Sequence, residues 1–469
     1  MQGLRAASSA LTLPIGKPNT SLMIAQAYEP TLRNPDEAPD ILSYPYYQDR
    51  DAQLNKAVEK VSLEASSQGR SRLRRGVRER PATVPPAATP THVPVLLDET
   101  VTLWLNPLDT AKKAKLRKRR QPQHVVQTLD DKVEVPTATA PRFFVDGTAG
   151  FGGHSRELLV REPQAQLLCI DRDPEVLAIA RANLSEFKSR VVFHRGSYAD
   201  LSPALLQSVH FPDEVHGICV DLGANSFHFD EPRRGFSFMR DGPLDMRYDQ
   251  HDATAATAAH VVNTFSEVQL TQIFRDLGEE RLAKEFAKVI VRDREEKGVV
   301  FTHTSHLREC IERIARKWHG SSKKPRGSGG SSHPATKCFQ ALRIYVNDEL
   351  THVAAGVEQL VAQLAPTGRL ATIAFHSLED RPIKLLFRRL DTFTRRTMDD
   401  EYEDYFDDDD DDDADGAEHD DDRVQDVLKR LGARRFQLVK RKAVKAKKLE
   451  IERNPRARSA RLRCLERIL

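Results

Sequence analysis

The chain has 469 residues, which is long enough for two or three domains with sizeable cores, and its formal net charge of only +3 hides strong local asymmetry. Its five cysteines are scattered without paired metal-ligand spacing, which favours free thiols in a reducing compartment over a metal site. No apolar run is long enough to span a bilayer, so we expect no membrane-spanning segment and no membrane partner.

The first 90 residues are predicted to be an extension that precedes the folded part of the chain. Met1–Tyr28 contains two basic residues, no acidic residue and many Ala, Ser and Thr, which is typical of an organellar transit peptide; a disordered N-terminus is the alternative. Glu29–Pro90 is rich in Pro, Ser, Arg and Ala, which predicts a disordered arm. Its basic cluster Gln68–Glu79 is equally consistent with contacts to RNA phosphates and with a solvated tail.

A short segment and a helix are predicted for His92–Leu105, leading into the first folded domain. Asn106–Ala140 follows, and its run KKAKLRKRRQ (Lys112–Gln121) is too basic to be buried. We therefore expect a surface loop that contacts RNA, with a loop of no function as the alternative.

Phe143–Val145 is apolar and suits a buried strand, which Asp146 closes before a glycine-rich loop. Glycine has no Cβ, so the backbone of such a loop can turn at positive φ and approach a ligand closely. A helix, HSRELLVRE, is predicted directly after the loop. Strand, glycine loop and helix start together predict a nucleotide-type cofactor site, and a simple turn is the alternative. The glycines are Gly147, Gly150, Gly152 and Gly153.

Strands and helices alternate after this loop. Buried strands are predicted at Gln166–Asp171, Arg190–His194 and Val215–Leu222, with a helix at Pro174–Leu184. This alternation predicts an open parallel sheet that binds ligands at the carboxyl ends of its strands. Asp171 follows the glycines by roughly twenty residues, where an acid can accept hydrogen bonds from both ribose hydroxyls. The side chains expected at that edge are Asp146, Asp171, Tyr198 and Asp221.

The acidic character of this edge bears on the choice of cofactor. A dinucleotide needs a helix N-terminus free for its pyrophosphate, whereas here the helix opens with His154 and acids flank the loop. Acids suit a cationic or uncharged ligand better than a phosphate. S-adenosyl-L-methionine carries a sulfonium and no phosphate, so it is favoured over the nicotinamide cofactor of a dehydrogenase.

The region after the fourth strand changes character. Asp230–Asp249 interleaves arginines with Phe and Met, which suits a pocket lip that stacks a base and holds phosphates; a loop packed on the sheet is the alternative. His251–Lys317 is predicted to form amphipathic helices, for example at Phe265–Leu277 and Glu280–Arg292. Gly320–Lys337 is predicted to be a flexible basic loop that contacts phosphates or serves only as a linker.

The last third of the chain combines a helix, a strand and two charged segments. Ala341–Leu364 is predicted as one long helix and Arg369–Phe375 as a further buried strand. His376 invites a general-base role, but a structural hydrogen-bonding histidine is the preferred interpretation. Asp407–Asp422 is expected to be solvated and disordered, either mimicking nucleic acid or binding a basic protein, and Arg434–Arg463 is basic enough for a tail bound along RNA.

From His92 onward the sequence resembles one family, the MraW/RsmH-type small-subunit ribosomal RNA cytosine-N4 methyltransferases. The resemblance implies a Rossmann-like α/β fold with an inserted all-helical domain, S-adenosyl-L-methionine as methyl donor and a cytosine of ribosomal RNA as acceptor. Residues 106–140 are an insertion relative to the family. The matching stretches are HVPVLLDETV, FVDGTAGFGGHS, LLCIDRDP, DLGANS, RRGFSFMRDGPLDMRYD, GEERLAKEFAKVIV, HPATKCFQALRIYVNDEL, FHSLEDR and NPRARSARLR.

The resemblance also implies a domain organisation. The methyltransferase domain comes in two parts, the helical substrate-recognition domain lies between them, and extensions flank them. The expected bounds are 1–90 for the N-terminal extension, 91–232 and 336–395 for the methyltransferase domain, 233–335 for the helical domain, 396–423 for an acidic disordered insertion and 424–469 for a basic tail that contacts ribosomal RNA.

The site residues implied by the resemblance fall on the same predicted edge. Tyr198 stands where the family often has Phe, His228 stands where Gln is usual, and Asn225-Ser226-Phe227 replaces Ser-Ser-Pro. Asp221, Asn225 and Ser226 follow the fourth strand and are the expected catalytic residues, as acceptors for the N–H groups of the target amine. No metal is expected. The implied cofactor-binding residues are Gly152, Gly153, His154, Asp171, Tyr198, Asp221 and His228.

Two functions remain open from the sequence. The first is an active ribosomal RNA methyltransferase, expected in the mitochondrion, with plastid and cytoplasm as alternatives. The second is a catalytically weak or inactive protein of the same fold that binds ribosomal RNA during small-subunit assembly, which the altered stretch 225–228 and the charged extensions favour. The expected partners are small-subunit ribosomal RNA and the assembling small subunit, with a homodimer or other assembly factors as further alternatives.

Overall fold

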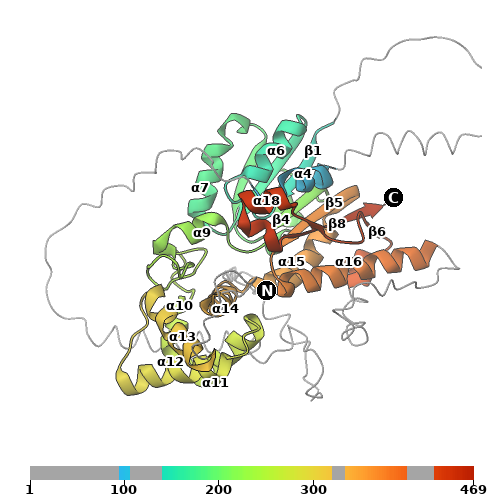
Figure 1. Ribbon diagram of the computed structural model, residues 1–469. Coiled ribbons are helices and arrows are strands. Elements are labelled where there is room, and N and C mark those ends of the chain that lie inside the picture. The colour runs from blue at the N-terminus through green and yellow to red at the C-terminus, as the bar shows by residue number, and fades with distance from the viewer. Residues whose placement is uncertain (1–93, 106–139, 320–332, 399–426, 469) are drawn as a thin grey trace, which may run out of the picture. The chain divides into compact units, whose positions relative to one another are not determined.

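A central sheet organises the chain in the computed structural model, which describes residues 94–105, 140–319, 333–398 and 427–468 (Figure 1). All of these residues fall in one structural unit of the chain. The predicted N-terminal arm, the predicted acidic run and nearly all of the two basic loops 106–140 and 320–337 lie outside the described residues. No helix among the described residues is long and apolar enough to cross a membrane.

The sheet has the order β3-β2-β1-β4-β5-β8-β6, with β7 paired to β8. The first five strands in this order run parallel to one another, β8 is antiparallel to β5, and β6 and β7 are antiparallel to β8. The order reverses between β1 and β4, and in such sheets the ligand site lies at the carboxyl ends of the two strands where this happens. The strands are β1 Arg142–Asp146, β2 Ala165–Asp171, β3 Val191–Arg195, β4 Val215–Asp221, β5 Leu364–Ala374, β6 Arg435–Leu438, β7 Val444–Lys445 and β8 Arg461–Ile468.

Helices cover both faces of this sheet, which explains why its parallel strands are apolar runs rather than alternating ones. Phe144 and Leu167 pack into one core together with α4 and α6, whereas Val145 and Leu168 pack into the other core with α15 and α16. Neighbouring residues therefore face opposite layers, as the period of a strand requires. The helices next to the sheet are α4 Leu97–Leu105, α6 Gly153–Arg161, α7 Pro174–Asn183, α8 Pro203–Ser208, α9 Ser226–Asp230, α15 Glu349–Ala362, α16 Ser377–Met398 and α18 Lys448–Arg453.

Between α9 and α15 the chain forms a second group of helices. Figure 1 shows them gathered together beyond α9, on one side of the sheet. A π-helical turn, Ile273–Leu277, follows α11 directly and packs against α14, so the predicted helix Phe265–Leu277 is two shorter segments. The helices of this group are α10 Ala258–Thr264, α11 Glu267–Gln272, α12 Ala283–Lys297, α13 Thr304–His319 and α14 Ala335–Asn347.

The single long helix predicted for Ala341–Leu364 is wrong. The chain forms two helices, α14 and α15, which are separated at Asp348, where φ is 55°. The amide of Asn347 donates to the Met246 carbonyl at 2.7 Å, and its Oδ1 accepts from the Tyr248 N–H at 2.8 Å. These contacts to a distant loop fix the residue before the break, and apolar periodicity in the sequence carries no sign of them.

The predicted C-terminal tail also needs correction, because its last described residues form a strand inside the sheet. β8 lies between β5 and β6 and buries Leu462, Cys464 and Leu465. Two basic residues of the predicted tail, Arg461 and Arg463, pair with the buried Asp380 at 3.0 and 2.7 Å. High basic content therefore concealed a strand whose arginines meet an internal carboxylate.

Candidate active site

Three carboxylates end neighbouring strands at the reversal point of the sheet. Asp146 of β1 lies opposite Cys169 of β2 and Cys219 of β4, so Asp171 and Asp221 each extend two residues beyond it on either side. The glycine loop joins the two flanking strands, because the Gly147 N–H donates to the Cys219 carbonyl at 2.8 Å and the Ala149 N–H donates to the Ile170 carbonyl at 2.9 Å. The structure therefore brings the three predicted acids together.

The glycine loop adopts backbone conformations that favour glycine. Gly150 and Gly152 have φ values of 54° and 81°, and Gly152 is the N-cap residue of α6. A Cβ on Gly153 would lie 2.2 Å from Pro94 Cγ, so this glycine allows the segment that enters the domain to cross the loop. His154 is buried beneath that crossing, with Nε2 3.0 Å from the Val95 carbonyl oxygen.

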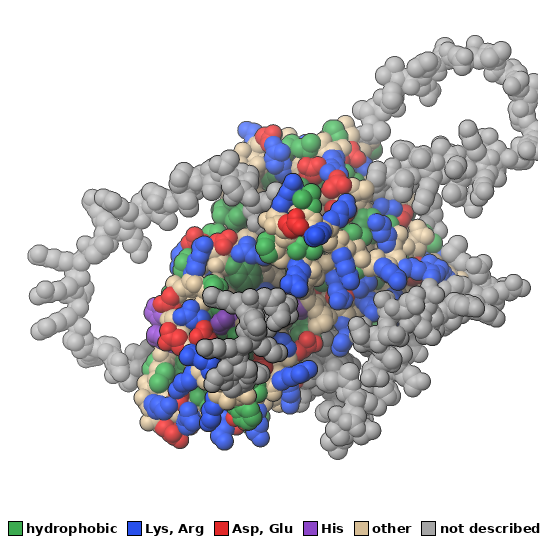
Figure 2. Space-filling model, viewed as in Figure 1, with side chains coloured by type: hydrophobic (Ala, Val, Ile, Leu, Met, Phe, Trp, Pro, Cys, Tyr) green, Lys and Arg blue, Asp and Glu red, His purple; other side chains and the backbone are tan. Residues whose placement is uncertain are grey.

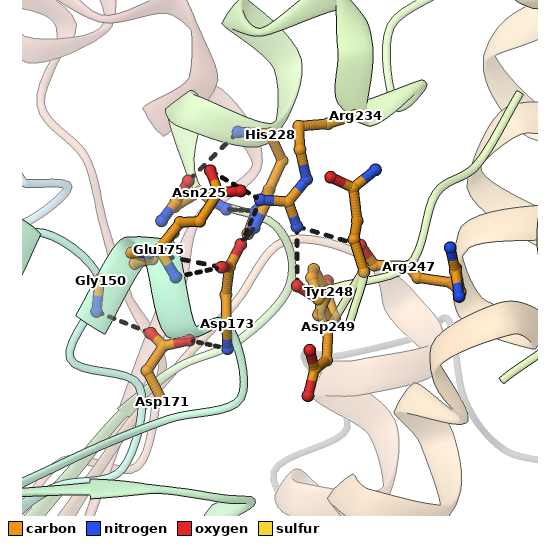
Figure 3. Close-up of polar contacts among 12 residues, drawn as sticks. Gly150, Asp171, Asp173, Glu175, Asn225, His228, Arg234, Arg247, Tyr248 and Asp249 are labelled. Carbon is orange, nitrogen blue, oxygen red and sulfur yellow. Dashed lines mark hydrogen bonds and ion pairs between the residues drawn. The ribbon is translucent and has the colours of Figure 1, made fainter. Parts of the chain in front are cut away.

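Asp171 is held by the backbone at both carboxylate oxygens. Oδ2 accepts from the Gly150 N–H and Oδ1 accepts from the Asp173 N–H, each at 2.9 Å (Figure 3). Burial raises the pKa of Asp171 to about 7, against the opposing effect of these two N–H donors. Each carboxylate oxygen keeps a second lone pair, so Asp171 is oriented but still able to accept hydroxyl groups of a ribose.

Asp146 has an internal role at the centre of the site. It accepts from the Ser155 hydroxyl at 2.6 Å and from the Thr148 N–H at 3.3 Å, which ties the strand end to α6 and to the loop. Burial raises the pKa of Asp146 to about 6. Its carboxylate is 2% exposed, so it shapes the loop rather than facing a ligand.

Asp221 differs from both of these acids. Its backbone N–H donates to Thr148 Oγ1 at 2.6 Å, but its side-chain Oδ1 is buried without a hydrogen-bond partner among the described residues. Burial raises the pKa of Asp221 well above its usual range, and the nearby carboxylates of Asp146 and Glu379 raise it further. A positive charge or an N–H donor brought to this oxygen would therefore be strongly favoured.

Tyr198 lies at the end of the loop that follows β3, between the glycine loop and α15. A Cβ on Gly147 would come within 2.8 Å of Tyr198 Cβ, and a Cβ on Gly356 would come within 2.7 Å of Tyr198 Cε2. Burial raises the pKa of the Tyr198 phenol. The ring is thus fixed by close packing on both sides, and its contact with adenine stays a prediction.

His228 is buried in a network that engages both of its ring nitrogens (Figure 3). Nδ1 accepts from the Asn225 N–H at 3.2 Å, and Nε2 lies 2.9 Å from Asp173 Oδ2. Burial holds the pKa of His228 below its usual range, so Nε2 carries the single proton and donates it to Asp173. Both ring nitrogens are therefore engaged within the protein, and the cofactor contact predicted for His228 stays a prediction.

Asn225 and Ser226 open the short helix α9, three and four residues after Leu222. The Asn225 side chain caps this helix, with Oδ1 accepting from the His228 N–H at 3.3 Å. Ser226 is buried at the first position of the helix. Both residues thus lie directly after the strand that carries Asp221, as the sequence predicts, and their catalytic roles stay predictions.

Sequence reasoning missed the buried ion pair beside Asp171. Arg234 is 1% exposed, and its Nη1 lies 2.6 Å from Asp173 Oδ2, while its Nη2 donates to the Tyr248 carbonyl at 2.7 Å. Although burial alone would raise the pKa of Asp173, His228 and Arg234 hold it below its usual range. The Asp-Pro pair at the start of α7 signals the cap that Asp173 forms, but an arginine in a basic run gives no sign of burial.

Comparison with known proteins gives a consistent picture. Residues 89–398, more than half of the chain, match the model of the MraW methylase family. A ribosomal RNA small subunit methyltransferase H from Citrifermentans bemidjiense is 38% identical over 350 residues, which cover 74% of this chain and 99% of the relative. The protein of the same name from Leptospira borgpetersenii is 42% identical over 246 residues, covering 52% of this chain and 73% of the relative.

Solved structures are only distantly similar. An O-methyltransferase family protein from Burkholderia thailandensis is 10% identical with a TM-score of 0.22, covering 70% of this chain and 51% of that one. A likeness this weak supports no conclusion about the fold. The assignment of the chain to a family therefore rests on the family match, and the description of its fold rests on the sheet order.

The residues at the strand ends fit S-adenosyl-L-methionine, the methyl donor of such methylases. Asp221 offers a buried, unpartnered carboxylate oxygen in a negative surrounding, which suits a sulfonium. Asp171 offers an oriented carboxylate for ribose hydroxyls, beside a loop whose Gly150 and Gly152 adopt positive φ. This edge of the sheet therefore has a set of donors and acceptors that matches the cofactor.

Proposed function

We propose that this chain, which belongs to the MraW methylase family and is an S-adenosyl-L-methionine-dependent methyltransferase of small-subunit ribosomal RNA, methylates the exocyclic N4 amine of a cytosine. The relatives that carry the name of a small-subunit ribosomal RNA methyltransferase support the substrate class. The observation that carries the proposal is the unpartnered Asp221 Oδ1, next to the oriented Asp171 and the glycine loop.

The chemistry asks for positioning more than for a strong base. The lone pair of a cytosine amine is delocalised into the ring, so transfer needs the amine held in line with the methyl group at about 3 Å. S-adenosyl-L-methionine supplies an activated methyl group on a good leaving group. Asp171 would orient the cofactor through its ribose. Asp221, Asn225 and Ser226 would accept the amine N–H groups, which favours a pyramidal nitrogen and offsets its growing positive charge.

The helices between β4 and β5 support a nucleic-acid substrate. Helix α12 exposes Lys284, Lys288 and Arg292 at intervals of four residues, so the three cations share one face. Figure 2 shows Lys and Arg side chains gathered over the part of the visible face where Figure 1 has α11 and α12. Such cations bind phosphates without regard to sequence, and the cytosine must be unpaired or flipped out to reach Asp221.

The direct test is methyl transfer by the full-length chain. The protein would be incubated with labelled S-adenosyl-L-methionine and small-subunit ribosomal RNA, and the modified nucleoside identified by mass spectrometry. N4-methylcytosine is the expected product. Methylation at another atom would contradict the N4 assignment, and no transfer to small subunits at any assembly stage would contradict catalysis.

An organellar location is part of the proposal, with the mitochondrion preferred over plastid and cytoplasm. It rests on the composition of Met1–Tyr28, which lies outside the described residues. Imaging a fluorescent fusion of the whole chain against one lacking these residues tests it. Loss of mitochondrial signal on deletion is expected, and an unchanged distribution would contradict it.

A second candidate function is that of a non-catalytic factor for small-subunit assembly. The altered stretch Asn225-Ser226-Phe227 favours it, because this loop borders Asp221 and Phe227 packs against Phe151 of the glycine loop with ring centroids 6.0 Å apart. Sequencing small-subunit ribosomal RNA with and without the protein separates the two functions. Loss of N4-methylcytosine supports catalysis, whereas stalled assembly with unchanged methylation supports the second candidate. A homodimer and other assembly factors are further proposed partners, to be tested by light scattering and by purification with assembling subunits.

A further inference from the structure

A second buried polar cluster adjoins the loop that carries the proposed catalytic residues. It joins α14, α15 and the start of α16 through Arg343, Glu349, His376 and Glu379. Arg343 Nη2 lies 2.9 Å from Glu349 Oε2 and 3.8 Å from Glu379 Oε1, and His376 Nε2 lies 3.0 Å from Glu379 Oε1. Tyr248 closes the cluster by donating its hydroxyl to Glu349 Oε1 at 2.8 Å.

The pairing of β4 with β5 brings this cluster next to Asp221. Asp221 lies opposite Ile373, three residues before His376, and the Leu222 N–H donates to the Ile373 carbonyl at 2.9 Å. A Cβ placed on Gly223 would lie 3.5 Å from Glu379 Oε1, so the cluster contacts the turn that leads from Asp221 to α9. The two carboxylates are close enough for Glu379 to raise the pKa of Asp221.

The charges of the cluster indicate which of its groups are ionised. Burial alone would raise the pKa of Glu379, but His376 and Arg343 hold it below its usual range. Glu349, His376 and Glu379 place ligand-type atoms within 4.8 Å of one another, as a metal site would. The guanidinium of Arg343 already contacts Glu349 and approaches the other two residues, so it supplies the positive charge that a cation would bring.

The contact with Glu379 determines the tautomer of His376. Nε2 lies 3.0 Å from Glu379 Oε1 and 3.5 Å from Arg343 Nη2. An ionised carboxylate only accepts hydrogen bonds, so the shorter contact places the proton on Nε2, which donates it to Glu379 Oε1. In the neutral imidazole the remaining ring nitrogen, Nδ1, then carries a lone pair. It is buried and has no hydrogen-bond partner among the described residues.

The hydrogen-bond partners of His228 and His376 differ at the second ring nitrogen. Both ring nitrogens of His228 are bound, one to Asp173 and one to the Asn225 N–H, as expected for a structural histidine. His376 also has a carboxylate partner at Nε2, Glu379, but its Nδ1 is an acceptor without a partner among the described residues. Buried acceptors without a partner are rare in folded proteins, and two of them, His376 Nδ1 and Asp221 Oδ1, occur at the ends of adjacent strands.

We propose that His376 Nδ1 accepts a proton of the target amine during methyl transfer, and that Glu379 is the positioning residue that holds the imidazole in this tautomer. This inference rests on the proposed function. An exocyclic amine has two N–H groups and needs two acceptors, which Asp221 Oδ1 and His376 Nδ1 provide in place of Asn225 and Ser226, since Asn225 Oδ1 already caps α9. This proton-accepting role replaces the structural role that the sequence alone favours for His376.

The step balances in atoms and charge. The amine nitrogen forms a bond to the methyl carbon while the sulfur–methyl bond breaks. The electron pair of the broken bond stays on sulfur, which becomes a neutral thioether. The methylated nitrogen carries the positive charge and loses one N–H proton to His376 Nδ1. The imidazolium is stabilised by Glu379 and later releases the proton to water, which leaves neutral N4-methylcytosine.

The test compares substitutions of His376 in the full-length chain by single-turnover methyl transfer to small-subunit ribosomal RNA. His376→Gln places an amide N–H where Nε2 was, which preserves the contact with Glu379, but it has no basic nitrogen. His376→Ala removes both contacts. Wild type and His306→Ala, a change of an exposed histidine on α13, serve as controls. The affinity for S-adenosyl-L-methionine and the melting temperature are measured for each variant.

We expect both substitutions of His376 to slow transfer by about 100-fold, within the usual range for general base catalysis, while cofactor affinity stays within twofold. Added imidazole is expected to restore part of the rate to His376→Ala and none to His306→Ala. Glu379→Gln removes the charge that accepts from Nε2 and is expected to shift the rising limb of the pH–rate profile, with Arg343 and Glu349 as the other charged groups beside this histidine. Glutamine at 376 with a wild-type rate, or no rescue by imidazole, would overturn the inference.

The design separates this inference from the proposed function. If the wild-type chain transfers methyl groups to another atom or not at all, the proposed function fails and the inference fails with it. If the wild type produces N4-methylcytosine and His376→Gln does so at the same rate, only the role of His376 is refuted.

Discussion

The buried hydrogen-bond acceptors on the two sides of the β1–β4 reversal point differ in whether the protein supplies their partners. On the β1–β2 side, Asp146 and Asp171 receive hydrogen bonds from a hydroxyl and from backbone N–H groups of the loop. On the β4–β5 side, Asp221 Oδ1 and His376 Nδ1 receive none from the described residues. The acceptors of the first side are therefore fixed by the protein and form a cradle in which Asp171 still has lone pairs for a ligand, whereas the second side has two acceptors without a partner among the described residues.

The largest expected effect comes from removing an open acceptor. Asp221→Ala should lower the single-turnover rate of methyl transfer by about 10³-fold, because it removes the carboxylate closest to the developing charge. Circular dichroism and melting temperature should show an intact fold, since no hydrogen bond of the described residues depends on Oδ1. A variant that keeps the full rate would remove Asp221 from the mechanism.

On the β1–β2 side, disrupting the buried ion pair between Asp173 and Arg234 should reduce the stability of the fold more than the rate of methyl transfer. Arg234→Ala leaves the buried Asp173 Oδ2 with His228 as its remaining partner, while Oδ1 still caps α7, and should lower the free energy of unfolding by about 3–5 kcal/mol. The matched control is Arg233→Ala, whose side chain is 51% exposed and pairs with Glu175. That change should cost less than about 1 kcal/mol. Equal losses for the two variants in urea denaturation would show that the pair at Arg234 is not structurally important.

A substitution of Asp171 tests whether this side of the site binds the cofactor. Asp171→Ala should weaken the binding of S-adenosyl-L-methionine by about 10²-fold, because it removes charge-assisted hydrogen bonds to the ribose worth about 1.5–3 kcal/mol each. Isothermal titration calorimetry measures this, with the exposed Asp213→Ala as control. Unchanged affinity would show that the ribose assignment is wrong.

The smallest expected effect is on the pH dependence of cofactor affinity, which separates the contribution of Asp221 from that of Asp171. Because the pKa of Asp221 is raised and a cation binds its ionised form best, cofactor binding should release a proton, and affinity should rise with pH by at most about tenfold per unit below that pKa. The pKa of Asp171, about 7, affects the binding of S-adenosyl-L-methionine in the same way as that of S-adenosylhomocysteine, which lacks the sulfonium charge. The ratio of their affinities between pH 6 and 8 therefore isolates Asp221. A ratio independent of pH would mean that Asp221 does not face the sulfonium.

Much of the fold could be predicted because strand and helix periodicity is local. The predicted strands around Phe144, Leu168 and Ile218 correspond to β1, β2 and β4, and the glycine loop and its helix lie where expected. The break at Asp348 and the strand β8 could not be predicted. Asn347 meets a loop a hundred residues away, and Arg463 of β8 meets Asp380, more than eighty residues away.

Site residues divide in the same way. Asp171 and Asp221 were predictable because a strand end places its last residue at the edge of the sheet. His228 and His376 were not, because each imidazole takes its role from partners on other elements: Asp173 and Asn225 bind both nitrogens of one, and Glu379 binds a single nitrogen of the other.

The alternation of strands and helices along the chain, the glycine loop and the acids at the strand ends follow from the sequence alone, because each depends on residues within a few positions of one another. Which buried acceptors are satisfied and which stay open was decided only by the tertiary structure. Hydrogen-bond partners for a buried atom come from whichever elements the fold packs against it, and here those elements are separated by tens to hundreds of residues along the chain.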